Sequence, residues 1–262
     1  MKKRLFVKKI AIIILIWIGM FLLPTYGKEL LSGKEIMEKV FNRYDGDDAY
    51  FKIEMVLVDK RGNARRRILK VYTKDYGELM KSYLEFLKPP DIRGVKFLSW
   101  ENKDKDDTQY LYLPALGRAR RIVSSQKNLR FVNTDFTYED MQRRHPDKDT
   151  HTLLGEEIYQ EYPCFVVESI PKKGTSQYSK RIFWVDKERF LVLKTEFYDK
   201  RGKKCKIFRV EKIEEISGIW TATRTVMEDL ARHHKTLMNV VEVKYNQGTE
   251  DEIFTLSNLE KD

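Results

Sequence analysis

The sequence lacks the short motifs on which common enzyme active sites are built. It contains no Gly-x-Ser-x-Gly nucleophile turn and no glycine-rich phosphate loop followed by lysine. Carboxylates are abundant, but their spacing singles out no pair that could act as general acid and base. We therefore assign no catalytic residue and expect a protein that is not an enzyme.

Metal-binding patterns are also weak. One stretch alternates histidine with aspartate, at His145, Asp147, Asp149 and His151. In an extended loop these side chains could meet a divalent metal, but without a third histidine or a cysteine pair a hydrophilic loop is favoured. The stretch NKDKDDT begins like a calcium loop, yet Asp107 and Leu113 stand where such a loop requires glycine and an acid. The expectation is no metal and no cofactor.

Cysteine is scarce, with only Cys164 and Cys205 in the chain. An even number in an exported protein permits one disulfide, whereas two separate buried thiols fit the strand-like surroundings of both residues equally well. Linkers are absent too, since no stretch between predicted elements is longer or richer in flexible residues than a turn. The mature chain is therefore predicted to form one domain.

Only one long uncharged apolar run is present, at residues 10–23. Five basic residues precede it, and the small residues Thr25 and Gly27 follow at the spacing of a signal-peptidase site. The alternative is an uncleaved anchor, but a spanning helix needs about 20 apolar residues. The sequence has no cysteine near this predicted cleavage site, so a lipid-modified N-terminus is not expected. We predict a signal peptide at 1–27 and an exported domain at 28–262.

Positive charge is not in large excess once this segment is removed. The formal net charge of +10 falls to +5 without residues 1–27. An exported, mildly basic protein is not expected to bind nucleic acid. The stretch QYLYLPALGRARRI at 109–122 mixes aromatic and basic residues, but Pro114 and Gly117 divide it into a strand, a turn and a second strand.

The pattern of the mature chain is mainly that of β-strands. A helix is predicted at 32–44 from a capping box of Ser32 and Glu35, and a second, shorter helix within 133–151. About eleven strands are predicted elsewhere, with the same DKRG turn in two hairpins, at 59–63 and 199–203. No strand alternates with a long helix, so the sheet is expected to be antiparallel. The predicted fold is mainly β (α+β): a single curved sheet forming an incomplete barrel, with helices covering its concave face.

One block of sequence resembles a known family. The block is FLKPPDIRGVKFLSWENKDKDDTQYLYLPALGRARRI followed by RFVNTDFTYEDM, and it spans residues 86–141. It is similar to the outer-membrane lipoprotein-sorting proteins, a LolA/LolB-like group of periplasmic carriers. The family commonly has Gly-Ser where this chain has Asn133-Thr134. Asparagine tolerates unusual backbone angles and threonine can cap, so the turn is expected to be kept.

The resemblance implies a half-barrel with an apolar cavity that takes up lipid or lipoprotein acyl chains. It also implies transient membrane contact and an inner-membrane transporter as partner. The alternative is an envelope adaptor that docks on a lipid or RND-type transporter without carrying a ligand. The cargo and the oligomeric state stay undetermined. Candidate cavity residues are the aromatic and aliphatic ones of the middle strands, although core packing is the favoured role for each, because a barrel must fill its interior: Phe97, Trp100, Leu111, Leu113, Phe165, Trp184, Phe197 and Trp220.

The charged residues of the block suggest a structural link. Three arginines, Arg118, Arg120 and Arg121, precede an acidic segment that holds Asp135, Tyr138, Glu139 and Asp140. We predict that at least one of these arginines pairs with one of the acids and ties the second helix to the sheet.

Overall fold

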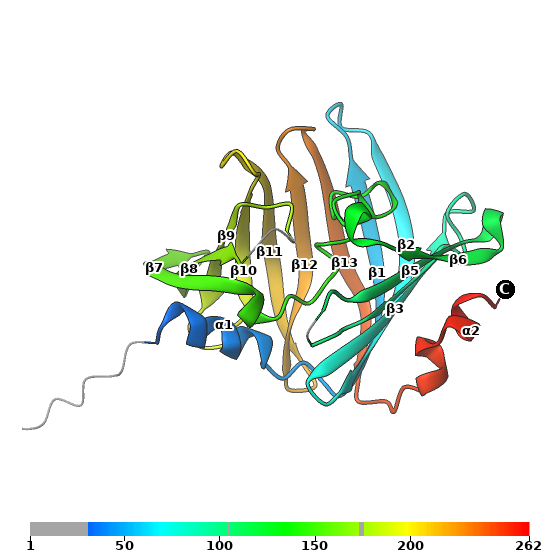
Figure 1. Cartoon of the computed structure of the whole chain (residues 1–262), viewed down its shortest axis with the longest axis horizontal. Helices are drawn as coiled ribbons and strands as arrows, with labels where there is room; N and C mark the ends of the chain where they lie inside the picture. The colour runs from blue at the N-terminus through cyan, green and yellow to red at the C-terminus, as the bar shows by residue number, and fades with distance from the viewer. Residues whose placement is uncertain (1–30, 104, 173–175, 262) are drawn as a thin grey trace, which may run out of the picture. The chain divides into compact units, whose positions relative to one another are not determined.

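The computed structural model describes residues 31–103, 105–172 and 176–261, and one antiparallel sheet dominates them (Figure 1). Within these residues the sheet has 13 strands, where the sequence predicted about eleven. The strands are β1 Asp48–Val58, β2 Ala64–Tyr76, β3 Leu79–Lys88, β4 Lys96–Trp100, β5 Thr108–Leu113, β6 Arg118–Ile122, β7 Asp149–Tyr159, β8 Tyr162–Pro171, β9 Lys180–Asp186, β10 Val192–Tyr198, β11 Lys204–Ile216, β12 Ile219–Asp229 and β13 His234–Tyr245. The predicted signal peptide lies outside the described residues.

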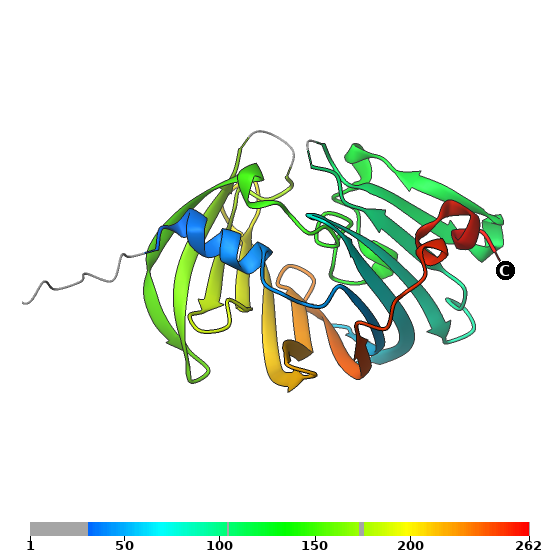
Figure 2. The same ribbon diagram turned by 90° about the horizontal axis from the view of Figure 1, so that it is seen from below.

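The strand order explains how the chain crosses its own interior. Strands β1 to β6 follow one another outward, β13 to β7 do the same in the other direction, and β1 pairs with β13 between them. The edge strands are therefore β6 and β7, and the sheet is not closed. Residues 123–148 must lead from one edge to the other. This crossing segment runs over the concave face, as the view from below shows (Figure 2).

Helix α1, Gly33–Phe41, lies against the β7 end of the sheet. The predicted capping box is confirmed, because Ser32 Oγ accepts from the Glu35 amide and Glu35 Oε2 accepts from the Ser32 amide. The inner face of α1 buries Ile36 and Met37 against β8 and β9. A helix this short is not stable by itself in water, so its packing on the sheet is what stabilises it.

The predicted second helix is not formed. Residues 133–151 contain turns, a 3₁₀ turn at Pro146–Lys148 and the start of β7. Side chains of Thr137 and Asp140 bond to the local backbone, which favours turns over a continuing helix. The segment between β6 and β7 is therefore irregular, and the expectation that helices cover the concave face is not confirmed.

The turns of two hairpins match their prediction. Asp59 accepts from the amides of Arg61 and Asn63, and Asp199 accepts in the same way from Arg201 and Lys203. The stretch at 109–122 is also the predicted hairpin, with β5 and β6 joined by a 3₁₀ turn at Pro114–Leu116.

The C-terminal segment covers the opposite face of the sheet. Phe254 and Leu259, the latter in α2 Leu256–Leu259, pack on Tyr83 and Leu98. Trp100 Nε1 donates to the Phe254 carbonyl at 2.9 Å. Both faces of β3 to β5 are thus in contact with other parts of the chain.

The open question of the cysteines is settled in favour of separate thiols. Cys164 and Cys205 are both free, and burial raises the pKa of each thiol to about 11. Among the described residues, no helix is long and apolar enough to cross a membrane.

Candidate functional site

A cavity of about 590 Å³ lies between the concave face of β9 to β13, helix α1 and the crossing segment. We refer to it as the main cavity. Its volume falls within the range of about 300–1,000 Å³ that is usual for ligand pockets. It exists because the crossing segment and α1 bridge the curved sheet without filling the space beneath them.

The wall of the main cavity is largely apolar and rich in methionine. Methionine fills irregular space and adapts to ligands of variable shape, because its chain is flexible and its sulfur polarisable. The apolar lining residues are Met37, Val40, Phe41, Phe136, Met141, Pro146, Phe183, Val192, Phe197, Phe208, Met227 and Met238.

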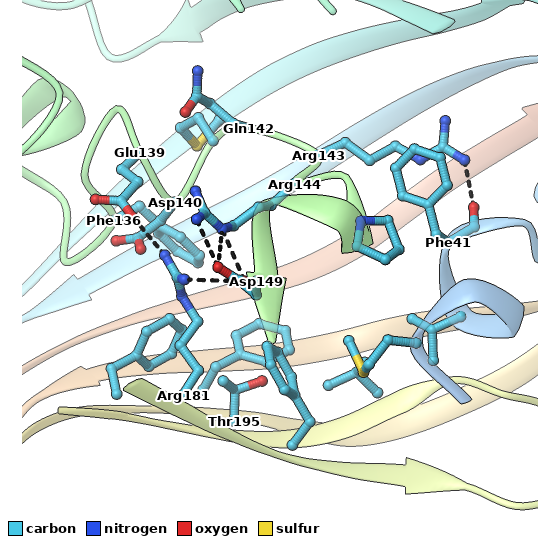
Figure 3. A pocket seen from close by; sticks show the side chains of 18 of the residues that line it. Phe41, Phe136, Glu139, Asp140, Gln142, Arg143, Arg144, Asp149, Arg181 and Thr195 are labelled. Carbon is cyan, nitrogen blue, oxygen red and sulfur yellow. Dashed lines mark hydrogen bonds and ion pairs between the residues drawn. The ribbon is translucent and has the colours of Figure 1, made fainter. Parts of the chain in front are cut away.

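One side of the main cavity is a buried network of charges (Figure 3). Arg181, on β9, donates from Nη2 to Glu139 at 2.5 Å, while Arg144 forms a fork on Asp149 with bonds of 2.6–2.9 Å. Glu139 also accepts from the Ser176 hydroxyl and from the Gln177 amide. The carboxylates are therefore fully engaged. Arg181 Nη1 points toward Asp149 at 3.9 Å and donates no hydrogen bond among the described residues.

Two further acids of the crossing segment bind other strands. Asp140 accepts from the Tyr178 hydroxyl at 2.8 Å and from Lys206 of β11 at 3.0 Å. Burial, and then the charge of Asp140, raise the pKa of Tyr178 well above its ordinary value, so its hydroxyl keeps its proton and donates. Asp135 is fully buried and accepts from the Thr236 hydroxyl and from the β13 residue His234, each at 2.7 Å.

A third link joins the crossing segment to α1. Arg143 donates to the Phe41 carbonyl at 2.5 Å, and its guanidinium lies 4.0 Å from the Phe41 ring centroid. Glu101, just after β4, lies 3.6 Å from Arg143 and accepts from the Met80 amide at 2.9 Å. Burial raises the pKa of Glu101 to about 7, although the Met80 amide and Arg143 act in the opposite direction.

This raised pKa predicts a pH dependence of stability. The unfolded chain releases the Glu101 proton near its ordinary pKa of 4.5, whereas the folded chain holds it until about 7. The contribution of Glu101 to the free energy of unfolding should therefore fall as pH rises from about 4.5 to 7 and stay at its lowest value above pH 7. Glu101→Gln should remove this slope and raise the free energy of unfolding at pH 8 by about 1–2 kcal/mol. Urea unfolding at several pH values measures it; an unchanged slope in the variant would contradict the assignment.

The main cavity includes one of the eight residues predicted to line it. Phe197 lies on its wall, whereas Phe97 is in the filled core with Phe131 and Tyr138. The remaining candidates lie elsewhere. Leu111 and Leu113 line another pocket, of about 580 Å³, beside β6, and Phe165 packs on Phe190. Trp100 contacts the C-terminal segment, Trp184 lies under Lys194 on the opposite face, and Trp220 lies beside Arg189. The prediction that Trp100, Trp184 and Trp220 line the cavity was wrong in register, since adjacent strand residues face opposite sides.

The predicted arginine–acid link is also wrong. Arg118, Arg120 and Arg121 are exposed on the edge strand β6, and none forms an ion pair with the acids of the crossing segment in the part of the chain that the structure describes. The acids instead pair with Arg181, Lys206, Arg232 and His234, which come from the other half of the sheet. Tyr138, which lies between these acids in sequence, is buried in the core.

Other site residues were missed, although the sequence carries a signal for two of them. Arg181 alternates with Phe183 and Val185 on the inward side of β9, and an inward charge in an apolar alternation indicates an internal ion pair. Lys206 follows the same logic on β11. The methionines gave no such signal, because they are brought together only by the tertiary fold.

The alternating histidine and aspartate residues are engaged in structural bonds. Asp149 binds Arg144, and His151 contacts Ser169 Oγ at 2.6 Å and the Pro146 carbonyl at 2.8 Å. The described residues hold no group of three or more histidine, cysteine, aspartate or glutamate side chains arranged for a metal ion.

Comparison with known proteins places this fold among close relatives. A protein-family model described as “-like: Uncharacterized protein” matches residues 78–261. A DUF1329 family protein from Desulfovibrio piger is 31% identical, with 87% of this chain and 97% of that chain covered and a TM-score of 0.83. An outer membrane lipoprotein-sorting protein domain from Vibrio parahaemolyticus is 29% identical, with coverages of 87% and 98% and a TM-score of 0.83.

A more distant protein of known structure has the same fold. It is a LolA superfamily protein from Nitrosomonas europaea that is 22% identical, with 86% of this chain and 98% of that chain covered and a TM-score of 0.67. No curated protein matches the sequence significantly. The family expected from residues 86–141 is thereby confirmed. The chain belongs to the family of these DUF1329 and outer-membrane lipoprotein-sorting proteins, and it has the fold of the LolA superfamily.

Proposed function

We propose that this protein is a non-enzymatic periplasmic carrier that binds lipid or lipoprotein acyl chains in the main cavity. The observation that carries the proposal is the apolar, methionine-rich space of about 590 Å³ beneath α1 and the crossing segment. Burying an acyl chain there would contribute about 0.8 kcal/mol for each CH₂ removed from water. The predicted signal peptide supports export, and the family name supports a role in lipoprotein sorting or in lipid transport to the outer membrane.

A carrier must also receive and release its cargo at membranes. We propose transient membrane contact and an inner-membrane transporter as donor, with α1 as the element that moves. At its first turn the link to the crossing segment is the exposed ion pair of Lys34 with Asp147, and at its last turn Phe41 contacts Arg143 and His145. Exposed ion pairs contribute only about 0–1 kcal/mol, so the Lys34 end of α1 can separate from the crossing segment at low cost.

Filling the main cavity tests the proposal. Val192→Trp adds a large side chain to the wall on β10, and we expect it to displace bound acyl chains because it occupies their volume. Native mass spectrometry with lipid extraction, on protein purified from a diderm host, should detect lipid on the unaltered protein and at least tenfold less on the variant. Transfer of a fluorescent acyl probe should fall in parallel.

The matched control is Val241→Trp, the same change at an exposed position of β13. It should keep both the lipid and the probe transfer. Absence of lipid and of transfer in the unaltered protein would overturn the carrier proposal and favour an adaptor that docks on a membrane transporter without a ligand. Equal loss in both tryptophan variants would show that the lipid binds somewhere other than the main cavity.

A further inference from the structure

A second, separate pocket lies at the rim of the sheet. Its volume is about 300 Å³, and it shares no lining residue with the main cavity. The β1–β2 hairpin, the β12–β13 turn and residues 130–133 of the crossing segment surround it, and the two hairpins stand side by side at the top of Figure 1. We call it the rim pocket. It is lined by Leu57, Asp59, Asn63, Arg65, Arg67, Arg130, Asn133, Arg232 and His234.

Guanidinium groups dominate the rim pocket. Four arginines from three separate segments line it, and the one carboxylate in its wall, Asp59, is already bonded to the amides of Arg61 and Asn63. Asp135 lies behind the wall and accepts from Arg232, His234 and Thr236. These acids are therefore occupied by the fold, and positive charge remains at the pocket.

The four arginines differ in how firmly the fold holds them. Arg67 is half-buried, donates to the Val132 carbonyl at 2.8 Å and lies 5.6 Å from the Phe86 ring centroid, while Arg232 is fixed on Asp135. Arg65 and Arg130 are exposed, and neither side chain forms a hydrogen bond or ion pair with the described residues. Two guanidinium groups are thus held in place, and two are available to close on a ligand.

The backbone beside the pocket supports a built site. Val132 and Asn133 have φ values of 45° and 62°, a left-handed conformation that is costly for a β-branched residue. This conformation places the Val132 carbonyl on Arg67 and brings Asn133 into the wall. The predicted tolerance of Asn133 for an unusual backbone angle is confirmed here. Thr134 does not cap the start of a helix; its hydroxyl donates to the Phe131 carbonyl at 2.7 Å and accepts from the Phe136 amide.

We propose that the rim pocket binds a phosphate group. The planar fork of arginine matches phosphate oxygens two at a time, and several guanidinium groups around one pocket balance a group of one to two negative charges. The side-chain amide of Asn133 adds a neutral donor, whereas that of Asn63 already donates to Asp59. The phosphate can belong to an anionic lipid headgroup or to a soluble phosphorylated compound, since both present the same oxygens.

The proposal does not depend on the acyl-chain cavity, and charge-removing variants test it separately. Arg65→Gln/Arg130→Gln removes the two arginines without partners, so the fold should be retained. The matched control, Arg118→Gln/Arg120→Gln, removes the same charge from the exposed edge strand β6. Two probes are used on each protein at constant ionic strength: inorganic phosphate by titration calorimetry, and phosphatidylcholine vesicles with or without phosphatidic acid by flotation.

The unaltered protein should bind at least one of the two phosphate probes. The rim variant should bind it at least tenfold more weakly, and the β6 variant less than about threefold more weakly. Binding of inorganic phosphate identifies a soluble source, and binding to phosphatidic acid vesicles alone identifies a headgroup; both support the site. No binding of either probe, or equal losses in the two variants, would overturn it. Neither result bears on acyl-chain binding, so the two proposals can fail independently.

Discussion

Replacement of Glu139 by alanine is expected to lower the free energy of unfolding by about 3–5 kcal/mol. Glu139 and Arg181 form an ion pair whose side chains are only 5% and 7% exposed. Removal of the carboxylate leaves the guanidinium buried beside Asp149, which lies 3.9 Å away and is already bound by Arg144. An uncompensated buried charge is costly, because it has lost water without gaining a partner.

Urea unfolding followed by tryptophan fluorescence measures this loss. The double variant Glu139→Ala/Arg181→Met should recover most of the stability, since it removes both charges and keeps a long apolar side chain. The matched control is Glu156→Ala, which breaks the surface ion pair with Lys187 and should cost less than about 1 kcal/mol. A loss that is equal in the single and double variants would show that the carboxylate acts through Ser176 and Gln177 rather than through Arg181.

Local features of this fold can be predicted from the sequence. The capping box of α1, the two DKRG turns and the 109–122 hairpin all depend on residues that are close together in the chain. Partners across the fold cannot be read in this way. The crossing segment follows β6 directly, so Arg118, Arg120 and Arg121 are close to its acids in sequence, but those acids face β9, β11 and β13.

One of the strands missing from the predicted count has a local explanation. The pattern of residues 156–171 predicts a single strand, but Gln160 and Glu161 form a tight turn between β7 and β8 with φ values of 48° and 75°. Such angles usually require glycine or asparagine, so the turn carries no sequence signal. The lining of the main cavity was missed for a different reason. It depends on which strands face α1, and strand order is a property of the whole fold.

The second large expected effect is a loss of stability when one methyl group is added to helix α1. Gly33→Ala should lower the free energy of unfolding by about 1–3 kcal/mol and release α1 from the sheet. A Cβ at Gly33 would lie 2.7 Å from the Leu153 nitrogen and 2.8–2.9 Å from backbone atoms of Thr152. Backbone of the β7 edge strand cannot move aside as a flexible side chain would, so the helix must retreat.

Helix propensity alone predicts the opposite sign, because alanine is favoured over glycine by about 1 kcal/mol in a helix. The sign of the change therefore distinguishes close packing of α1 from mere helix formation. Thermal unfolding gives the sign, and hydrogen exchange of the α1 amides should show faster exchange in the variant while the amides of β1 and β13 keep their protection. Lys34→Ala, at the exposed neighbouring position, is the control and should change stability by less than about 0.5 kcal/mol. A stabilised Gly33→Ala protein with unchanged exchange would mean that α1 does not lie this close to β7.

If α1 is released, the wall formed by Met37, Val40 and Phe41 opens, and an acyl probe bound in the main cavity should dissociate faster from the same variant.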